Sequence, residues 1–575
     1  MESKWMLYTK RADFEKISAR FHISPVLARI IINRDIKEED FSLYLKSDLS
    51  LMHDAGRLYG VEDAYNEIMS EIKKGNKIRV VGDYDIDGVC SSYILVKSLR
   101  RFGANADVRI PDRIKDGYGI NDNIINEAAN DKISMIITCD NGIAAHSQME
   151  LARKLGIKVI ITDHHEVYQE DGKDYLPVAD VVINPKRSEC KYPFKSICGA
   201  LVAYKLMEYM FERLYGKKMY EDGELSDLLE VAAIATIGDV MPLVDENRVL
   251  VKHGLKSLMN TKNLGLRALI KATGMEGKKI SAYSIGFVIG PCLNAGGRLE
   301  NALVALNMFM SESSDEANEY AMHLKELNDE RKDLTAMNVK VAVELAEREY
   351  VDDDILVIYL ENCHESIAGI IAGRVREALG KPTIILTDAF GEDGMIKGSG
   401  RSIESYNMFE ALYEVKDIFE KFGGHHMAAG MSLKKDRLDE FRKRLNENSR
   451  LTKEDFIQKI WIDVPLPFSY ISLDFVRELE KLEPYGNKNE KPKFARKGIK
   501  ILSKSILGKN KNVVKMVLED DGTRLDGIYF CDGEAFFEEL KGNNEIDIIY
   551  YPDINEYGGR ESLQVIITGY KIKNI

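Results

Sequence analysis

The stretch VVGDYDIDGVCSS (Val80–Ser92) carries the strongest structural signal in the chain. An apolar run leads into three alternating carboxylates, Asp83, Asp85 and Asp87, and Gly88 follows. This order is typical of a buried strand that ends in a loop, and open α/β sheets bind ligands at that edge. Because alternate residues of a strand share one face, we expect the three acids to converge. Close carboxylates need a cation or protons, so a divalent metal site and a solvated acidic turn are both open here.

Two further predicted strands end in polar residues in the same way. We expect strands over 134–139 and 158–162, which run into Asp140-Asn141-Gly142 and Asp163-His164-His165. Helical segments separate them, and strands that alternate with helices predict a parallel sheet. The fold class is therefore α/β, with polar residues gathered at the carboxyl ends of the strands.

An apolar helix is expected over 226–237, and it ends at Gly238-Asp239. A carboxylate at the end of a buried helix is costly unless it is paired or binds a metal. A simple role in capping the next turn is the alternative for Asp239. Taken with the strand ends, this residue completes a mixed carboxylate and imidazole set: Asp85, Asp87, Asp140, His164 and Asp239.

Such a set suits hard divalent cations. Oxygen ligands favour Mg²⁺ or Mn²⁺, and the imidazole favours Mn²⁺. Two such ions about 3.5–4 Å apart can clamp a phosphorus centre for in-line attack. The residues therefore predict a two-metal phosphoesterase.

Eight motifs carry a resemblance to a known family. DYDIDG, TCDNG, TDHHE and GDVMPL, in this order, resemble the motifs of the DHH phosphoesterase superfamily. PDRIKDGYG (111–119), LNAGGRLENA (293–302), GSGRSIESYNM (398–408) and FGGHHMAAGMSL (422–433) resemble the RecJ family of single-strand-specific exonucleases. The resemblance covers nearly the whole chain. One departure is His426, where we expect a small residue beside His425.

The resemblance implies roles for the residues of the first four motifs. The implied metal ligands are Asp83, Asp85, Asp87, Asp140, His164 and Asp239. The implied catalytic residues are Asp85, Asp87, Asp140 and His165. Asp140 would bridge two ions, with Mn²⁺ preferred over Mg²⁺, and His165 would face the scissile phosphate. Whether Asp83 binds metal directly, and whether His165 is instead a supporting structural residue, stays open.

The downstream motifs are predicted to bind substrate. A glycine-rich backbone can approach a phosphate closely, and an arginine can grip it with two hydrogen bonds. The resemblance to a DHHA1 domain implies these substrate residues: Arg298, Arg374, Ser399, Arg401 and His425. Arg374 could otherwise be a surface arginine, and His425 and His426 are both candidates for the substrate contact.

The last part of the chain changes to β character. Five or six short predicted strands favour a small barrel, with the OB-fold as the natural candidate. Lysines and arginines between 491 and 515, together with Phe494 and Tyr529, suit a single nucleic-acid strand, and a solvated lysine-rich hairpin is the alternative. The expected domains are a helical lead-in (1–55), a DHH catalytic domain (56–311), a linker helix (312–350), a smaller α/β DHHA1 domain (351–450) and an OB-fold (451–575).

Composition limits the cellular setting. The net charge of −13 excludes a uniformly basic nucleic-acid coat. The seven cysteines form no CxxC pair, which predicts a reducing cytoplasm. The opening residues lack the apolar core of a signal peptide, and no apolar stretch is long enough for a membrane span.

By the resemblance, the chain is expected to degrade single-stranded DNA from 5′ to 3′, releasing 5′ mononucleotides, in DNA recombination and repair. A monomer that works with a helicase and a single-strand-binding protein is also implied. Two alternatives stay open. One is a DHH phosphodiesterase for short oligonucleotides or cyclic dinucleotides, and the other is a non-enzymatic scaffold. The presence of all the acids and both motif histidines argues against the scaffold.

Overall fold

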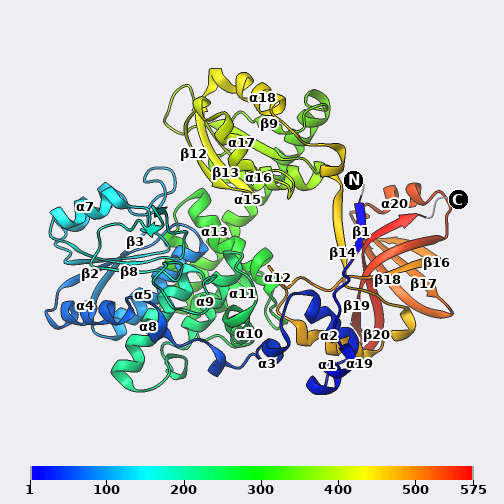
Figure 1. The fold of residues 1–575 in the computed structure, drawn as a ribbon, viewed down its shortest axis with the longest axis horizontal. Coiled ribbons are helices and arrows are strands. Elements are labelled where there is room, and N and C mark those ends of the chain that lie inside the picture. Colours follow the sequence, from blue (N-terminus) through cyan, green and yellow to red (C-terminus); the bar gives the residue numbers. More distant parts are fainter. Residues whose placement is uncertain (1–2, 573–575) are drawn as a thin grey trace. The chain divides into compact units, whose positions relative to one another are not determined.

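The computed structural model describes residues 3–572 (Figure 1). These residues divide into two compact units. The first unit comprises Met52–Met241 and His253–Gln458, and the second comprises Ser3–Leu51, Pro242–Lys252 and the chain from Lys459 onward. Within residues 3–572, no helix is both long and apolar enough to cross a membrane.

A five-stranded parallel sheet organises the first unit, which confirms the predicted α/β class. In spatial order its strands are β3 (Asn105–Arg109), β2 (Lys77–Val81), β4 (Met135–Cys139), β5 (Lys158–Thr162) and β8 (Val181–Ile183). The strands are rich in valine and isoleucine because both faces of a parallel sheet are buried. The strand order reverses beside β2, since β3 lies on one side of it and β4 on the other. Ligands bind at such a reversal.

In the described part of the chain, six helices pack around this sheet, and the last of them confirms the apolar helix expected over 226–237. They are α4 (Val61–Lys73), α5 (Ile86–Arg101), α6 (Asp122–Asn130), α7 (His146–Lys154), α8 (Gly199–Tyr215) and α9 (Asp227–Gly238). A second group follows: α11 (Leu264–Ala272), α12 (Ala282–Ser284), the π-helical turn η5 (Ile285–Ile289), α13 (Gly290–Leu299) and α14 (Leu303–Met310).

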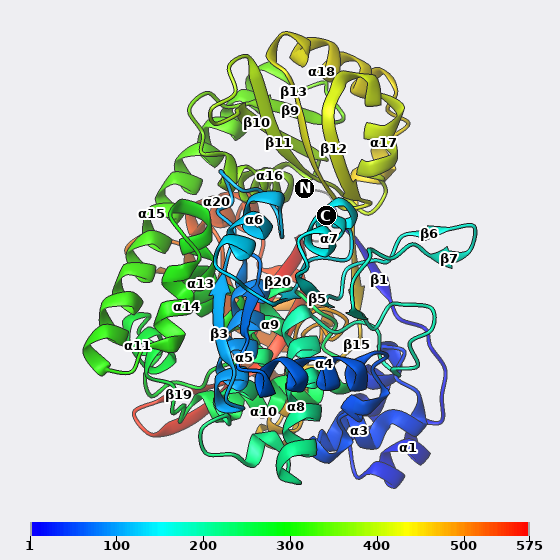
Figure 2. The same ribbon diagram turned by 90° about the vertical axis from the view of Figure 1, so that its left-hand side faces the viewer.

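One long helix, α15 (Ser314–Glu349), runs from this helical group to a second sheet (Figure 2). The predicted linking helix is thereby confirmed, as one helix and not two. Ala342 and Ala346 near its end are buried against the first strand of the second sheet. The helix is therefore packed at both ends.

The second sheet has the order β12-β13-β11-β10-β9. Its strands are β9 (Leu356–Tyr359), β10 (Thr383–Asp388), β11 (Met395–Arg401), β12 (Phe419–His425) and β13 (Ala428–Lys434), and its helices are α16 (Ala368–Leu379), α17 (Met408–Glu414) and α18 (Leu438–Glu447). Ser399 and Arg401 alternate on β11 and so share the face that α16 covers. The predicted smaller α/β domain is confirmed.

A closed barrel forms most of the second unit and confirms the predicted OB-fold. Its strands are β16 (Phe494–Leu507), β17 (Val513–Asp520), β18 (Thr523–Phe530), β20 (Arg560–Ile572) and β19 (Glu545–Tyr557), and β19 pairs back onto β16. The short strand β15 (Val464–Pro465) extends β16. Helices α19 (Leu473–Leu479) and α20 (Gly533–Leu540) complete this part of the chain.

The barrel corrects one detail of the expected strand-binding surface. Phe494 is completely buried in the barrel core, so it is not available for stacking on a base. Several of the basic residues are paired with acids: Arg496 with Asp520 and Asp521, Lys511 with Glu534, and Lys515 with Asp526. The alternative of a solvated basic hairpin therefore gains weight for this stretch.

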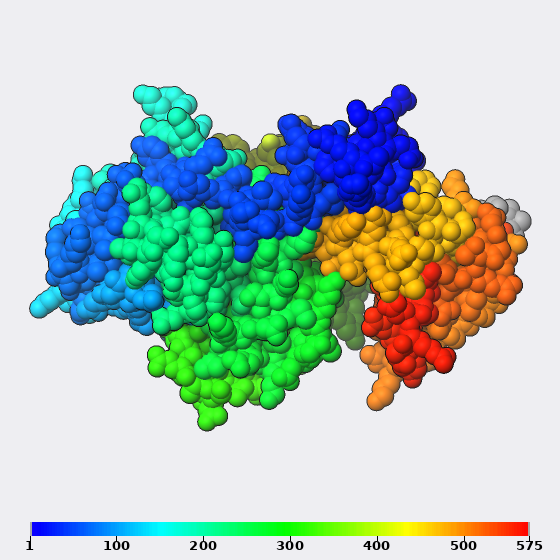
Figure 3. All heavy atoms as spheres, turned by 90° about the horizontal axis from the view of Figure 1, so that it is seen from below, coloured from blue at the N-terminus to red at the C-terminus, as the bar shows by residue number. Residues whose placement is uncertain are grey.

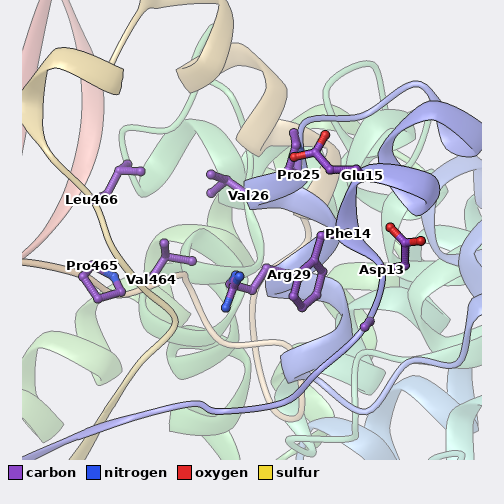
Figure 4. A pocket seen from close by; sticks show the side chains of 10 residues that line it. Asp13, Phe14, Glu15, Pro25, Val26, Arg29, Val464, Pro465 and Leu466 are labelled. Carbon is purple, nitrogen blue, oxygen red and sulfur yellow. The ribbon is translucent and has the colours of Figure 1, made fainter.

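The N-terminal helices share the core of the barrel. They are α1 (Phe14–Phe21), α2 (Pro25–Asn33) and α3 (Phe41–Lys46), and their buried side chains pack in one cluster with those of the barrel. Figure 3 shows this segment (dark blue) lying against the segment that leads into the barrel (yellow to orange). A depression of about 670 Å³ lies between α1, α2 and β15 (Figure 4). The boundaries of the five expected domains stay a prediction.

Candidate metal centre

The loops after β4 and β5 bring Asp140 and His164 together. The His164 Nε2 lies 3.1 Å from the Asp140 Oδ1. The same nitrogen lies 3.5 Å from the Asp87 Oδ2 and 3.7 Å from the Asp239 Oδ2. Four of the predicted ligands therefore meet where the strand order reverses. Asp140 holds a φ of 60°, a conformation that aspartate tolerates better than most residues and that is often found at functional sites.

The acidic triplet reaches this edge in a different way from the one we expected. Strand β2 ends at Val81, so alternation along a strand does not align the three acids. Asp85 is the N-cap of α5 and accepts hydrogen bonds from the backbone of Asp87 and Gly88. Asp87 lies in the first turn of the helix, and Asp83 lies in the loop before it. The prediction of convergence by strand geometry is therefore wrong.

The start of α8 holds the Asp87 carboxylate in place. The backbone N–H groups of Gly199 and Ala200 donate to its two oxygens at 2.6 and 2.8 Å. A helix N-terminus favours a negative charge, because its N–H groups and its dipole both point at it. Gly199 is also required sterically, since a Cβ added there would lie 2.7 Å from the Asp140 Cβ. The sequence motifs did not include this glycine.

Asp83 is fully buried on the other side of the triplet. Its Oδ1 accepts a hydrogen bond from the Gly119 N–H at 3.2 Å. Burial and the neighbouring Asp85 raise the pKa of Asp83 to about 7. A Cβ added at Gly88 would lie 2.4 Å from the Asp83 carbonyl oxygen, so the glycine of the motif allows the helix to start this close to the loop.

The gathered carboxylates destabilise one another electrostatically. Burial, followed by the charges of neighbouring acids, raises the pKa of Asp140 well above its usual range and that of Asp239 to about 8. Burial also raises the pKa of Asp87, and His164 partly opposes this effect. A cluster of this kind needs protons or cations at neutral pH.

The free ligand atoms fit a divalent cation. Among the described residues, buried atoms without a hydrogen-bond partner include Asp83 Oδ2, Asp140 Oδ1, His164 Nδ1 and Asp239 Oδ2. Two groups have ligand atoms within 4.8 Å of one another: Asp87, His164 and Asp239, and Asp140, His164 and His165. Carboxylate oxygens with an imidazole suit Mn²⁺ or Mg²⁺. Neither of these groups of described residues includes Asp83 or Asp85.

The two adjacent histidines have different environments. Burial lowers the pKa of His164, and a neutral imidazole is the form that binds a metal. His165 is more exposed, and its Nδ1 lies 2.8 Å from the Asp163 Oδ1. Although burial lowers the pKa of His165, its interaction with Asp163 outweighs that effect and raises the pKa to about 9. Asp163 thus orients the His165 side chain.

Tyr118 also belongs to this site. Its hydroxyl donates to the Asp140 backbone oxygen at 2.9 Å and lies 3.3 Å from the His165 Nε2. The residue lies within the motif PDRIKDGYG, but no role was predicted for it. Its position in a motif between two ligand-bearing strands was the available signal.

An arginine cluster lies beside the acids. Arg298 donates to the Ser366 backbone oxygen at 2.8 Å, and the Ser366 hydroxyl donates back to the Arg298 backbone oxygen. Burial, followed by the positive charges of Arg113, Arg331 and Arg401, lowers the pKa of Arg298 to about 10. The Arg113 guanidinium lies over the ring of Tyr84, with its Cζ 3.8 Å from the ring centroid. Tyr84 belongs to the acidic motif DYDIDG.

Two members of this cluster were missed by the sequence analysis. Arg113 lies in a quoted motif, but Arg331 lies in the charged helix α15, to which we assigned no chemistry. A single arginine among many charges on a long helix gives no recognisable pattern. Only the packing of α15 brings Arg331 to the site.

The remaining predicted substrate residues differ in how closely they join this cluster. Arg401 donates to the Ser399 hydroxyl at 2.8 Å, so these two residues act as one group. Arg374 is exposed and pairs with Glu377 on its own helix. His425 and His426 are both exposed, but the His426 Nε2 lies 3.0 Å from the Glu404 backbone oxygen. The His425 Nδ1 accepts from the Met427 N–H at 3.3 Å, which turns its Nε2 outward.

Comparison with known proteins relates this geometry to a family. Residues 77–236 match the DHH family, N-terminal domain, residues 352–450 match the DHHA1 domain, and residues 462–569 match the RecJ OB domain. The single-stranded-DNA-specific exonuclease RecJ of Escherichia coli (strain K12) is 32% identical over 562 residues, which cover 95% of each chain. The chain belongs to the RecJ family.

Other RecJ proteins support this assignment. The single-stranded-DNA-specific exonuclease RecJ of Bacillus subtilis (strain 168) is 36% identical over 99% of this chain and 71% of its own length. The crystal structure of RecJ in complex with Mn²⁺ from Thermus thermophilus has a TM-score of 0.84 and 25% identity, and the match covers 100% of this chain and 80% of that one. Asp239 and Arg298 lie between the DHH and DHHA1 matches, so these RecJ-family domains alone do not contain the whole site.

Proposed function

We propose that this chain is a metal-dependent exonuclease that degrades single-stranded DNA from the 5′ end and releases 5′ mononucleotides. The proposal rests mainly on one observation: a cluster of acids and a cluster of arginines lie next to each other in the first unit. Buried acids with unpartnered oxygens lie next to a group of arginines that, within residues 3–572, form no direct ion pair. A phosphodiester held by the arginines would lie next to cations held by the acids. Named RecJ relatives that are single-stranded-DNA-specific exonucleases give further support.

The proposed ligands are Asp83, Asp85, Asp87, Asp140, His164 and Asp239, with Asp87, Asp140, His164 and Asp239 best supported by their distances. We propose two ions, with Mn²⁺ preferred over Mg²⁺ and Asp140 as the shared ligand. When bound, the ions would polarise the phosphodiester and lower the pKa of the attacking water. Structures of RecJ with Mn²⁺ and with Mg²⁺ are known from Thermus thermophilus.

The chain's own residues would position the substrate. Arg298 has guanidinium donors beyond the one that it gives to Ser366, and these can grip a phosphate in a fork geometry. Arg401, held by Ser399, and His425 would contact the same terminal phosphate. Arg374 would contribute from the rim, where its charge is more strongly screened.

His165 would donate to the scissile phosphate. Its pKa of about 9 keeps both ring nitrogens protonated at neutral pH. The Nδ1 proton is directed at Asp163, and the Nε2 proton faces the Tyr118 hydroxyl. The Nε2 proton is therefore the one that can move to a phosphate oxygen as negative charge develops there.

The cellular role is a further proposal. We propose that the enzyme acts in DNA recombination and repair in the cytoplasm, as a monomer, on strands that a helicase opens and a single-strand-binding protein covers. The RecJ-type barrel lies outside the metal-binding domain. An additional domain of this kind is consistent with a long substrate and is not needed for a dinucleotide.

A degradation time course with Mn²⁺ tests the proposal. Single-stranded DNA labelled at either end, a matching duplex, single-stranded RNA and a dinucleotide would be compared, with Asp140→Ala as the control. Loss of the 5′ label as a mononucleotide from single-stranded DNA, abolished by the substitution, is the expected result. Rapid turnover of the dinucleotide with long strands untouched would move the protein to the short-substrate branch of the superfamily.

A further inference from the structure

Two aromatic rings are stacked in solvent beside the metal centre. The ring centroids of Tyr283 and Phe287 are 4.7 Å apart, with 25° between the ring planes. The side chains are 68% and 61% exposed, although aromatic rings contribute most to stability when buried. More than half of the surface of each side chain is therefore exposed to solvent, although the two rings contact each other.

The backbone that carries this pair is unusual. Phe287 lies in the π-helical turn η5, directly after the short helix α12 that carries Tyr283. Single π-turns are rare and are frequently found at functional sites. The turn lies against the elements that supply the acids, since Gly286 faces Ile237 at the end of α9 and Gly290 faces Ile86 at the start of α5.

The same stretch continues into the phosphate-binding cluster. Helix α13 begins at Gly290, directly after the turn, and carries Arg298 in its last turn. Arg298 lies eleven positions after Phe287, which corresponds to roughly 16 Å along a helix axis. The aromatic pair thus lies on the same element as the arginine, at a distance that only a substrate of several nucleotides can bridge.

The local charge favours a nucleic-acid strand. Lys278 and Lys279, both exposed, precede α12. A second exposed aromatic pair, Phe409 and Tyr413 on α17, is less suited to a nucleic acid. Glu410 and Glu414 line the same surface and would repel phosphates. Basic residues next to stacked aromatic rings are the combination that binds single strands without reading their sequence.

We propose that Tyr283 and Phe287 form a stacking platform for unpaired bases of the DNA strand, a few nucleotides from the bond that is cut. This inference rests on the proposed function. Stacking on a ring face needs a base that is free of its partner, so the platform would also favour single strands over a duplex. It would act on bases of any sequence, because every base presents a π-face.

Strands with and without bases test the platform. The full-length protein with Mn²⁺ would be given an oligothymidylate, and the same strand with abasic sites from the third nucleotide onward. Tyr283→Ala/Phe287→Ala is expected to raise KM about tenfold on the first strand, and to differ little from the wild type on the second. Phe390→Ala, which removes a ring that is 69% exposed elsewhere in the same unit, is the matched control and should leave both rates unchanged.

A fluorescence measurement supplies a readout that is independent of cleavage. Phe287→Trp keeps a ring at the site, and its added emission should be quenched by the oligothymidylate, and not by the abasic strand, when no metal is added. An equal loss of activity on both strands, or quenching by both, would overturn the platform. If the wild-type protein leaves both strands intact, the proposed function fails, and the quenching alone decides the stacking inference.

Discussion

A cluster of acids and a cluster of arginines lie side by side in the first unit. They differ in whether protonation can relieve the repulsion between their like charges. The carboxylates can take up protons, and the pKa values of Asp83 and Asp239 are raised to about 7 and about 8. The arginines cannot escape in this way, because the pKa of Arg298, lowered to about 10, still leaves it charged. When no cation is bound, the acids can become neutral by protonation. The arginines stay charged and attract an anion at any physiological pH.

Arg248 in the second unit shows what a buried arginine without a ligand site looks like. Its guanidinium donates to the backbone oxygens of Tyr44, Leu482 and Lys481 at 2.8 to 2.9 Å. Arg248 is buried and Arg298 is partly buried, but only Arg248 has its donors satisfied by the protein on three sides. The distinction between a structural and a binding arginine therefore lies in the unused donors and not in burial.

Removal of one acid should have the largest effect. Asp140→Asn is expected to reduce nucleotide release by about three orders of magnitude, because the substitution weakens the cation site. The same change should stabilise the metal-free protein by about 1 kcal/mol, since one buried like charge is lost. Release assays and thermal melts in a chelator measure the two effects. A lower melting temperature without metal would contradict the view that the acids repel one another.

Replacement of Arg298 should chiefly reduce activity, and replacement of Arg248 should chiefly reduce stability. Arg298→Met is expected to cut kcat/KM about a hundredfold with little loss of stability. Arg248→Met should remove three hydrogen bonds to backbone carbonyls and destabilise the protein by about 3 kcal/mol. Kinetics together with urea unfolding separate the two. If both variants chiefly lose stability, then Arg298 is structural as well.

A methyl group at Gly199 should weaken the site without removing a ligand. The added Cβ would press on Asp140 and move the N–H groups that hold Asp87. We expect a ten- to hundredfold higher Mn²⁺ concentration for half-maximal activity, roughly the effect of losing a supporting interaction. Gly223→Ala is the control, because nothing lies within 4 Å of a Cβ added there. An unchanged Mn²⁺ titration would show that the helix start does not position the acids.

The smallest effect is expected at Arg374. This side chain is 60% exposed and pairs with Glu377, so its charge is already screened. Arg374→Ala should raise KM less than about threefold, and only at low salt. A measurement at about 50 and 200 mM salt would reveal any larger role.

The sequence contained most of the acidic centre but little of what surrounds it. Asp140 and His164 lie in the loops after buried parallel strands, so their convergence could be predicted from sheet topology, and Asp239 was recognised because it ends a buried apolar helix. Convergence of the triplet by strand alternation failed, because β2 ends before Asp83 and a helix begins at Ile86. The supporting groups come from backbone and from distant helices: the Gly199 N–H and Arg331 leave no pattern in sequence.

The shared core of the barrel and the N-terminal helices has a consequence for synthesis on the ribosome. Ile30, Ile31 and Phe41 are synthesised before the barrel, yet they pack with Phe494 and Tyr550. Roughly 450 to 520 residues separate the two groups, which at about 5–20 residues per second is a delay on the order of tens of seconds. During this interval the first helices expose apolar surface that a chaperone could bind. The second unit can therefore complete its core only after the barrel has been synthesised.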